Sequence, residues 1–448
     1  MSWQDRYRDK LITAPQAAGL VKSGQSIVVS LNPKPREVLL EIARRAGELR
    51  GVELLSNWNE DYPWLHPGME DSFLVKEGFV LRPSRDAVRE KRLDWVPVIF
   101  GLHDGIRVAA ESLRSSPYHG SDLFLLSLTP PNTKGFCSFG YGVWYSPTGL
   151  RSAGTVIAQI DPGLPWTYGE SVHVSEIDYL VEATPSQPDA VPQATSLPDP
   201  TEWEQAQVIG ALAADLVRDG DTIQIGIGTP SEAVMGFLGI KNNLGVYSEL
   251  IFPQITQFMA QGIIAGSGGH QGRSKVATSC LWLNPGDPAA RPAVDFINRN
   301  RGIGFYDISY MCRVPRIAAH PNMVSINTAL AMDLLGQTVL DHIGPTPIAG
   351  PGGQVEFSIG SHYSPGGRSI TCLLSTARGG TISRIMPQLE PGTISQIPLT
   401  YIDYLVTENG VVNLEGKSRR ERAEAVISVA HPDFQSDLRR AARLLFWP

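Results

Sequence analysis

Glu249 has the greatest potential for chemistry in this chain, because predicted strands and a glycine turn surround it. An apolar run at 222–227 predicts a strand that enters a Gly-X-Gly turn at 226–228. A helix of about ten residues is expected from Ser231. A second short strand, 245–248, ends directly before the carboxylate. This strand, turn, helix and strand unit therefore has an acid at its far end.

The setting of Glu249 allows several interpretations. In an open parallel sheet, strand ends and the turns after them face one crevice, so the acid is expected to face whatever the glycine turn holds. A solvated acid at a strand end, without a role, is the simplest alternative. A dinucleotide site would use Gly226 and Gly228 for phosphate and Glu249, about twenty residues on, for a ribose. That pattern is incomplete, because Ser231 stands where the third glycine belongs.

Two glycine pairs later in the chain favour close contact with a ligand. Gly352 and Gly353 lie in a Gly-Pro-Gly-Gly-Gln word, and Gly366 and Gly367 form a second pair. Adjacent glycines let the backbone approach a ligand and point its N–H groups inward, as an oxyanion site requires. Tight turns with no ligand are the alternative.

A glycine-rich stretch, 262–275, is expected to be a loop because its composition does not suit a helix or a strand. Its Arg273 and Lys275 are candidates for contact with a phosphate. An exposed, solvated basic loop is the alternative.

Composition limits the classes of function. The 448 residues, 42% hydrophobic and 19% charged, predict a globular protein of two domains of about 200 residues each. A net charge of −7 argues against nucleic acid or an anionic membrane as a partner. The sequence begins with no apolar signal segment and contains no run long enough to span a membrane, so we expect a cytoplasmic protein.

Cysteine and histidine spacing gives no sign of a metal or a disulfide framework. Cys137, Cys280, Cys312 and Cys372 are scattered without a Cys-x-x-Cys pair. The nine histidines show no His-Glu-x-x-His spacing, and no Gly-x-Ser-x-Gly elbow of a serine hydrolase occurs. We therefore expect no metal and no serine nucleophile.

Two pairs of similar sequence segments indicate an internal duplication. Leu-Val-Lys-Ser-Gly at 20–24 corresponds to Leu-Val-Arg-Asp-Gly at 216–220, and both precede an apolar strand. Ile-Asp-Tyr-Leu-Val occurs at 177–181 and again at 402–406. Chance repetition of such words is improbable, so the chain is interpreted as two versions of one unit.

The predicted fold class is α/β, with two tandem, similar, open and mostly parallel α/β domains. A proline-rich stretch at 183–200 is the expected linker, which gives domains at 1–190 and 201–448. Strands are predicted at 26–31, 52–55, 123–128 and 154–160, and helices at 36–49 and 202–218.

Several words in the second half carry a resemblance to a known family. They are GIGTPSEAV, LGVYSEL, SINTAL, GPGGQVEF, SPGGRSI, DYLVTENGV, LEGKS and AHPDF. Together they resemble the acetyl-CoA hydrolase and transferase family, which includes the 4-hydroxybutyrate CoA-transferases and belongs to the glutamate-dependent CoA-transferases. The match is dense from about Val208 onward and thinner in the first half.

The resemblance implies an active site between two α/β domains, commonly in a homodimer, with Glu249 as the nucleophile. Its carboxylate attacks an acyl-CoA, and a covalent glutamyl-CoA thioester forms in a ping-pong reaction. The partners are an acyl-CoA and a carboxylic acid, with neither metal nor NAD. An acetyl-CoA hydrolase would use the same glutamate, and only water would replace the acceptor acid. A protein that only binds CoA would be favoured had the acid been lost.

The same resemblance assigns the other site residues. Backbone N–H groups of Gly352 and Gly353 and the side-chain amide of Asn327 are the expected oxyanion donors. The expected contacts of the thioester and of CoA come from Gly226, Ile227, Gly228, Gly350, Gln354, Gly366, Gly367 and Lys275.

This sequence departs from the family pattern at two places. Many relatives have His-Thr-Glu-Met where this chain has Tyr-Ser-Glu-Leu at 247–250, and Met-Pro-Arg-Thr where it has Leu-Pro-Trp-Thr at 164–167. Trp166 in place of an arginine removes a carboxylate-binding fork and adds apolar area. We therefore expect an acceptor acid that is larger or less polar than succinate.

Overall fold

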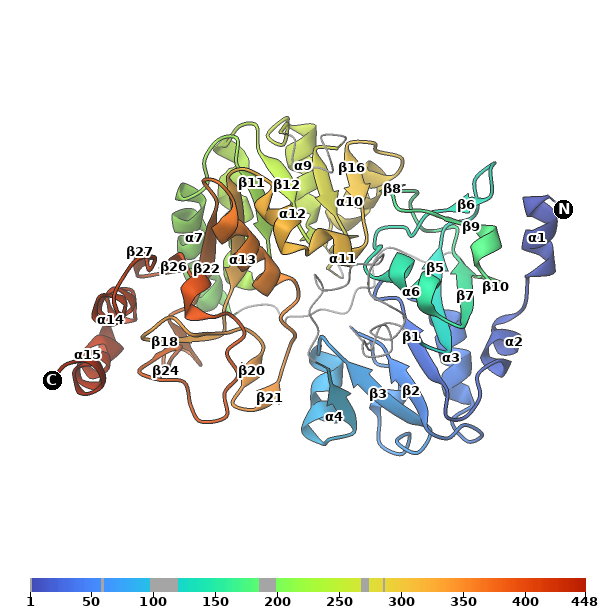
Figure 1. Ribbon diagram of the computed structural model, residues 1–448, viewed down its shortest axis with the longest axis horizontal. Coiled ribbons are helices and arrows are strands. Elements are labelled where there is room, and N and C mark those ends of the chain that lie inside the picture. The colour runs from blue at the N-terminus through green and yellow to red at the C-terminus, as the bar shows by residue number, and fades with distance from the viewer. Residues whose placement is uncertain (1, 58–59, 97–119, 185–198, 267–273, 285–286) are drawn as a thin grey trace. The chain divides into compact units, whose positions relative to one another are not determined.

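The computed structural model describes residues 2–57, 60–96, 120–184, 199–266, 274–284 and 287–448 (Figure 1). The chain forms two compact units that alternate along the sequence. Unit 1 comprises Met1–Ala194, Leu250–Gln257 and Gly269–Met311, and unit 2 comprises Thr195–Glu249, Phe258–Gly268 and Cys312–Pro448. The sequence predicts a single division into domains at 1–190 and 201–448, and these limits stay a prediction. Most of the proposed linker lies outside the described residues.

Unit 1 is built on a parallel sheet. Among its described residues, seven strands pair side by side, and neighbouring strands run parallel. In order across the sheet they are β10 (Tyr179–Glu182), β7 (Thr155–Ile160), β5 (Leu123–Leu128), β1 (Ser26–Val29), β2 (Val52–Leu55), β3 (Phe73–Glu77) and β4 (Leu93–Trp95). Three further strands of this unit, β14 (Val276–Thr278), β16 (Ile303–Phe305) and β8 (Tyr168–Gly169), also pair in parallel with one another.

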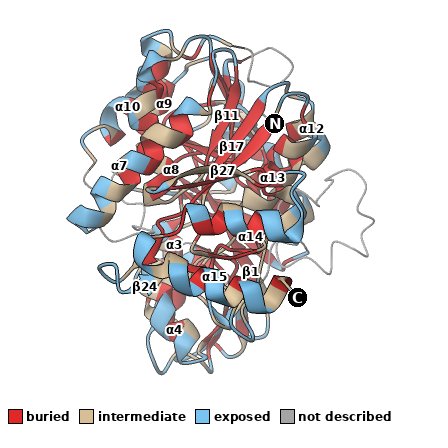
Figure 2. Ribbon diagram, turned by 90° about the vertical axis from the view of Figure 1, so that its left-hand side faces the viewer, coloured by how far each residue is buried: buried red, intermediate tan, exposed pale blue. Residues whose placement is uncertain are grey.

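Unit 2 repeats this plan. Its described strands follow the order β27 (Gly410–Asn413), β26 (Tyr404–Thr407), β22 (Arg368–Cys372), β17 (Met323–Thr328), β11 (Thr222–Ile225) and β12 (Gly245–Tyr247). All of these pairs are parallel except the β26–β27 hairpin. Figure 2 shows β11 and β17 buried along their length. The prediction of a mostly parallel α/β fold is confirmed.

Helices connect the parallel strands, as a parallel sheet requires. Those described are α1 (Trp3–Asp9), α2 (Ala14–Gly19), α3 (Arg36–Arg44), α4 (Arg85–Arg89), α6 (Ser146–Ser152), α7 (Pro200–Asp215), α8 (Thr229–Ala233), α9 (Pro253–Ala260), α10 (Ala290–Ile297), α11 (Ile308–Met311), α12 (Val314–Ala318), α13 (Gln354–Tyr363), α14 (Arg419–Ser428) and α15 (Pro432–Phe446). In α15, buried and exposed residues alternate around the helix (Figure 2). That amphipathic pattern marks a helix packed on one side only.

The strand order establishes the duplication. The series β10-β7-β5-β1-β2 in unit 1 corresponds, strand by strand, to β26-β22-β17-β11-β12 in unit 2. The repeated Asp-Tyr-Leu-Val word falls on β10 and on β26, which occupy the same place in the two series. Gly24 and Gly220 both have positive φ, 77° and 80°, two residues before β1 and β11. The repeated sequence segments therefore occupy equivalent positions in the two units.

Most predicted elements are present with shifted ends. Strand β5 matches its predicted range, β7 begins one residue later, and β1 ends two residues earlier. The expected helix after the glycine turn begins at Thr229, with Pro230 in its first turn, and changes to a 3-10 helix at 234–240. Pro suits the start of a helix, whereas Gly236 and Gly239 weaken the α-helix that would follow.

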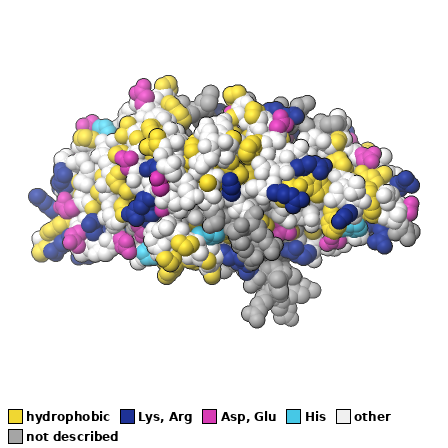
Figure 3. Space-filling view, turned by 90° about the horizontal axis from the view of Figure 1, so that it is seen from above, with side chains coloured by type: hydrophobic (Ala, Val, Ile, Leu, Met, Phe, Trp, Pro, Cys, Tyr) yellow, Lys and Arg dark blue, Asp and Glu magenta, His cyan; other side chains and the backbone are white. Residues whose placement is uncertain are grey.

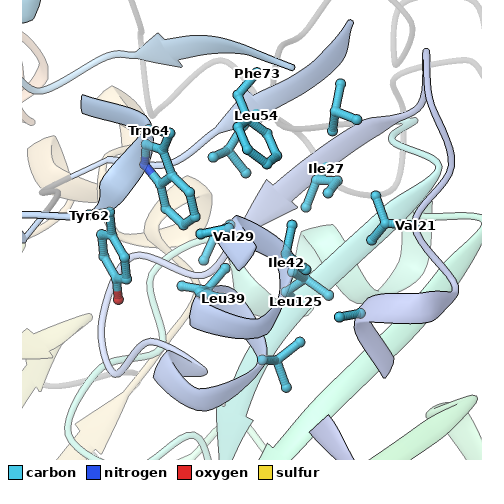
Figure 4. Packing of buried hydrophobic residues seen from close by; sticks show 14 of the residues in the cluster. Val21, Ile27, Val29, Leu39, Ile42, Leu54, Tyr62, Trp64, Phe73 and Leu125 are labelled. Carbon is cyan, nitrogen blue, oxygen red and sulfur yellow. The ribbon is translucent and has the colours of Figure 1, made fainter. Parts of the chain in front are cut away.

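The core of unit 1 lies where α3 packs on the sheet (Figure 4). Leu39 and Ile42 of α3 point toward Val29 and Leu54 from the neighbouring strands β1 and β2, and all four are fully or almost fully buried. Burial of one such side chain stabilises the fold by about 1.5–3 kcal/mol. This packing holds β1 and β2 in register, so the loops after them have defined positions.

The surface and helix lengths are those of an ordinary globular chain. On the face drawn in Figure 3, basic and acidic side chains are interspersed. Within the described part of the chain, no helix is long and apolar enough to cross a bilayer.

Candidate active site

Glu249 lies at the carboxyl end of the unit 2 sheet. It follows β12 by two residues, and β12 runs parallel to β11 with Ile223 opposite Val246. Only 8% of Glu249 is exposed. The backbone N–H of Gly353 donates a hydrogen bond of 2.6 Å to its Oε2 atom. The predicted nucleophile and the predicted glycine pair are therefore in direct contact.

The contact with Gly353 places the carboxylate at the start of a helix. Gly353 is the N-cap residue of α13, and its N–H points away from the helix toward Glu249. A helix N-terminus carries a positive partial charge, and an N–H bond to a carboxylate is stronger than a neutral one. Both effects stabilise the ionised form of Glu249.

Burial acts in the opposite direction and is stronger. It raises the pKa of Glu249 to about 8, the Gly353 N–H lowers this pKa, and the neighbouring carboxylate of Glu356 raises it further. Glu356 is itself buried in the first turn of α13. A carboxylate that is partly protonated at neutral pH, and poorly solvated when ionised, is a reactive nucleophile.

Gly353 is a glycine because no side chain fits at this position. A Cβ atom there would lie 2.6 Å from Oε2 of Glu249 and 2.7 Å from Sγ of Cys312. Gly352 has a φ of 55°, in the left-handed region, and a Cβ on it would lie 3.4 Å from the same Oε2. The glycine pair thus allows the chain to pass directly over the carboxylate.

The turn at 226–228 differs from the expected ligand cradle, because two of its N–H groups are used within the protein. The Gly226 N–H donates to the Ile326 carbonyl at 2.8 Å, and the Gly228 N–H donates to Oε1 of Glu232 at 2.9 Å. Among the described residues, the Ile227 N–H has no hydrogen bond. Ile227 is therefore the residue of this turn with a backbone donor available to a ligand.

Close packing explains why residues 226 and 228 are both glycine. A Cβ on Gly226 would lie 2.2 Å from Oδ1 of Asn327, and one on Gly228, with a φ of 136°, would lie 2.6 Å from Oγ1 of Thr328. Thr328 also receives the Ser231 N–H at 3.2 Å. The turn therefore packs directly against Asn327 and Thr328 at the carboxyl end of β17.

Glu232 is a functional candidate that the sequence analysis missed. Burial raises the pKa of Glu232, and its carboxylate accepts the Gly228 N–H. A capping box places a glutamate three residues after the N-cap residue, whereas Glu232 follows Gly228 by four, so this sequence pattern did not indicate the bond. Glu232 fixes the conformation of the turn through its bond with Gly228.

Asn327 lies at the carboxyl end of β17 and is buried. Its side-chain amide pairs with that of Gln224 on β11, with two hydrogen bonds of 2.9 Å. Gln224 was also missed, although a polar residue inside the apolar strand Thr-Ile-Gln-Ile signals a buried partner.

The remaining predicted residues separate into two groups. Gln354 is the first residue of α13, directly after Gly353, and its Nε2 atom is buried without a hydrogen-bond partner among the described residues. Gly350 lies in the loop that leads to α13. Both belong to the segment that covers Glu249.

Three predicted residues lie away from Glu249 or in unit 1. Gly366 and Gly367 precede β22 at its amino end, whereas Asn327 lies beside the carboxyl half of β22, opposite Thr371. A Cβ on Gly367 would lie 2.3 Å from the Ser361 carbonyl, so this glycine serves the turn after α13. Lys275 is exposed and belongs to unit 1. Arg273 lies outside the described residues.

Unit 1 contains a counterpart of the Glu249 position. Glu53 in β2 pairs with the first residue of β1, as Gly245 in β12 pairs with the first residue of β11. Counting onward equally from Glu53 and Gly245 leads to Asn57 and Glu249. Asn57 is therefore the residue of unit 1 that corresponds to Glu249.

The two positions share a local contact. The Gly78 N–H donates to Oδ1 of Asn57 at 2.5 Å, as the Gly353 N–H donates to Glu249. A neutral amide is a far weaker nucleophile than a carboxylate. Of these two equivalent positions, only the one in unit 2 has the chemistry of an acyl acceptor.

Comparisons with known proteins show the family of this chain. Residues 1–191 match the acetyl-CoA hydrolase/transferase N-terminal domain, and residues 291–442 match the corresponding C-terminal domain. The chain is 33% identical to 4-hydroxybutyrate coenzyme A transferase of Clostridium kluyveri, over 98% of each chain. It belongs to the acetyl-CoA hydrolase/transferase family.

Other known proteins are similar over the full length. Succinyl-CoA:cyclohexane-1-carboxylate CoA transferase of Geobacter metallireducens is 31% identical over 99% of this chain and 97% of its own. RipA from Yersinia pestis has a TM-score of 0.87 at 28% identity and covers both chains completely. A 4-hydroxybutyrate CoA-transferase structure from Porphyromonas gingivalis has a TM-score of 0.76 at 28% identity, over 99% of this chain and 100% of that one. The dinucleotide-binding alternative receives no support from these matches.

Within the acetyl-CoA hydrolase/transferase family, this member's departure at Tyr247 is explained by packing. Tyr247 is buried, and its ring centroid lies 4.2 Å from that of His320 and 6.2 Å from that of Phe357 in α13. Burial lowers the pKa of His320 to about 4, so a neutral ring faces the tyrosine. Tyr247 thus anchors β12 to α13, the two elements that bring Glu249 and Gly353 together.

We expect Gly353→Ala to reduce kcat about 100-fold, because the added Cβ must displace the Glu249 carboxylate by roughly an ångström. Gly239→Ala is the matched control, since a Cβ at Gly239 meets nothing within 4 Å. Steady-state kinetics with an acyl-CoA and an acid would measure the effect. Equal activity of both variants would contradict the tight contact.

We also expect kcat/KM to increase with pH, by about tenfold per pH unit well below the pKa of the free enzyme. Its midpoint should lie near pH 8, because the nucleophile is the ionised form and the pKa of Glu249 is raised to about 8. Glu356→Gln removes a like charge, so the midpoint should move to lower pH. A profile that is flat from pH 6 to 9, or a midpoint unchanged in Glu356→Gln, would contradict this interpretation.

Proposed function

We propose that this protein is a CoA-transferase that moves CoA between an acyl-CoA and a carboxylic acid through a covalent glutamyl-CoA thioester on Glu249. The observation that carries this proposal is the buried Glu249 carboxylate, held at 2.6 Å by the Gly353 N–H at the start of α13. The names of the similar proteins, which are CoA transferases, support the reaction class. Assembly as a homodimer and a cytoplasmic location stay predictions.

The first half-reaction makes and breaks two bonds. Oε1 of Glu249 attacks the acyl-CoA carbonyl carbon, the carbon–sulfur bond breaks, and CoA leaves as a thiolate. The product is a mixed anhydride between the acyl group and the glutamate. The thiolate then attacks Cδ of Glu249, and the donor acid leaves as its carboxylate with the attacking oxygen. Glutamyl-CoA remains, and the acceptor acid reverses these steps.

The Gly353 N–H suits one of these steps in particular. When the thiolate attacks Cδ, negative charge develops on Oε2, which is the atom that already accepts this N–H. A donor in place before the reaction needs no reorganisation when the charge appears. The side-chain amide of Asn327 is the second donor that we propose, at the same carboxyl edge of the sheet.

Burial of Glu249 favours transfer over hydrolysis. The anhydride and the glutamyl thioester both react with water, so a site that excludes water preserves them for the acid. With only 8% of Glu249 exposed, its carboxylate has little contact with bulk solvent. We propose that acyl-CoA hydrolysis, the alternative use of the same glutamate, is a minor activity.

The covalent intermediate gives a direct test. Protein mixed with an acyl-CoA, without an acceptor acid, should gain the mass of CoA less one water on Glu249, measured by intact-protein and peptide mass spectrometry. Glu249→Gln should show no adduct and no transfer. Glu249→Asp should lose about 100-fold in kcat, because the shorter arm withdraws the nucleophile by roughly an ångström. Wild-type protein without an adduct, together with an active Glu249→Gln variant, would refute the mechanism.

Trp166 is the residue from which we infer the size and polarity of the acceptor acid. It belongs to unit 1, where the guanidinium of Arg299 lies 6.0 Å from its ring centroid. We propose an acceptor that is larger or less polar than succinate. A relative named for cyclohexane-1-carboxylate gives a precedent for such an acid in the family.

We expect cyclohexanecarboxylate and branched or aromatic acids to give a higher kcat/KM than succinate when each is offered with acetyl-CoA. The new thioesters would be measured by mass spectrometry. Trp166→Arg should raise the relative rate with succinate, because a guanidinium binds a second carboxylate. A preference for succinate in the wild type would contradict this assignment.

A further inference from the structure

Gln224 is a buried amide outside the set of residues that contact Glu249. It is 2% exposed and lies in the middle of β11, between two apolar residues. β11 is the central strand between β17 and β12. Burial of an amide costs free energy unless all of its polar atoms are satisfied, so a glutamine in this place requires a specific partner.

That partner is Asn327. The Gln224 Nε2 donates to Oδ1 of Asn327, and the Asn327 Nδ2 donates to Oε1 of Gln224, each at 2.9 Å. In the register of β11 and β17, Gln224 lies opposite Ser325, so Asn327 is its diagonal neighbour two residues toward the carboxyl edge. Residues two apart on a strand share a face, which explains why the two amides meet.

This reciprocal pair leaves Asn327 with one free donor. A side-chain amide has two N–H bonds, and Gln224 accepts one of those from Asn327. The described residues provide no partner for the other. Gly226 packs against the oxygen end of the same amide, because a Cβ on Gly226 would lie 2.2 Å from Oδ1 of Asn327. The Gln224 pair thus fixes the plane of the Asn327 amide, and the second N–H of Nδ2 remains available.

We propose that Gln224 is a positioning residue that orients the Asn327 amide so that its remaining N–H can bind the oxygen that becomes negative in the transition state. This inference rests on the proposed function, because it assumes that an oxyanion forms in the site. Gln224 acts through Asn327 and does not itself contact the substrate. An amide suits the position, because it donates to one atom of Asn327 and accepts from the other.

Gln224→Leu and Gln224→Glu are the test variants. Leucine removes both hydrogen bonds. Glutamate keeps the size but cannot donate, so one of its oxygens faces Oδ1 of Asn327. We expect each variant to lower kcat about tenfold, with KM within about twofold, because the lost interaction matters mainly in the transition state.

Ser325→Ala is the matched control. The Ser325 hydroxyl is fully buried on the same strand as Asn327 and pairs with the Ser361 hydroxyl at 2.9 Å. Its loss removes a buried hydrogen bond without touching the amide pair. We expect lower thermal stability with unchanged kcat, whereas a general loss of packing would lower kcat in the control too. Circular dichroism melting curves would establish that every variant is folded.

A double-mutant cycle with Asn327→Ala isolates the coupling. Asn327→Ala should lower kcat about 100-fold, as removal of one oxyanion donor does. If Gln224 acts only through Asn327, Gln224→Leu should cause little further loss in that background. The same tenfold loss in both backgrounds, or a normal kcat in folded Gln224→Leu and Gln224→Glu, would overturn the inference.

The CoA adduct separates this inference from the proposed function. Gln224→Leu should still form the adduct on Glu249, more slowly than the wild type. If the wild type forms the adduct and both Gln224 variants form it at the wild-type rate, the inference fails and the proposed function stands. If the wild type forms no adduct, the proposed function fails and the inference fails with it.

Discussion

The hydrogen bond between the Gly353 N–H and the Glu249 carboxylate is the interaction on which the site depends. It joins the end of β12 to the start of α13 and places a charge where the helix N-terminus favours one. Burial and the nearby Glu356 raise the pKa of Glu249, whereas the Gly353 N–H lowers it, so the ionised carboxylate is only partly stabilised. The proposed mechanism needs a carboxylate that is poorly solvated when it ionises, and these opposing effects suit that role.

The glycines around this bond serve packing as much as chemistry. Gly353 leaves room for Glu249, and Gly226 leaves room for Asn327. In each case a Cβ atom would meet a polar atom of the proposed machinery at less than 3 Å. The N–H of Gly228, in contrast, is used by Glu232, which shows that a glycine turn need not offer all its donors to a ligand.

Duplication explains why the carboxylate stands at a strand end. Both units use the same five-strand order, and both place a polar side chain under a glycine N–H after the second strand of the unit. In unit 1 that side chain is Asn57, an amide, and in unit 2 it is Glu249. Equivalent backbones thus hold residues of different reactivity, and the difference lies in the side chain alone.

The α/β class and the duplication followed from local order, because apolar runs and repeated segments are properties of neighbouring residues. The choice of Glu249 as the nucleophile came from the family resemblance and stays a prediction. The roles of Asn327 and Gly353 were also implied by the resemblance and stay predictions, although the structure places the Gly353 N–H on the Glu249 carboxylate. The contact of Glu232 is local, but it depends on the conformation of the turn before α8. The contacts of Gln224 and Asn57 emerged only from the fold, since each depends on a partner from another strand or loop. The same holds for Gly366 and Gly367, whose spacing resembles that of the first pair although they lie at the amino end of β22. Strand direction and register decide which edge a residue occupies, and contacts between distant segments create both.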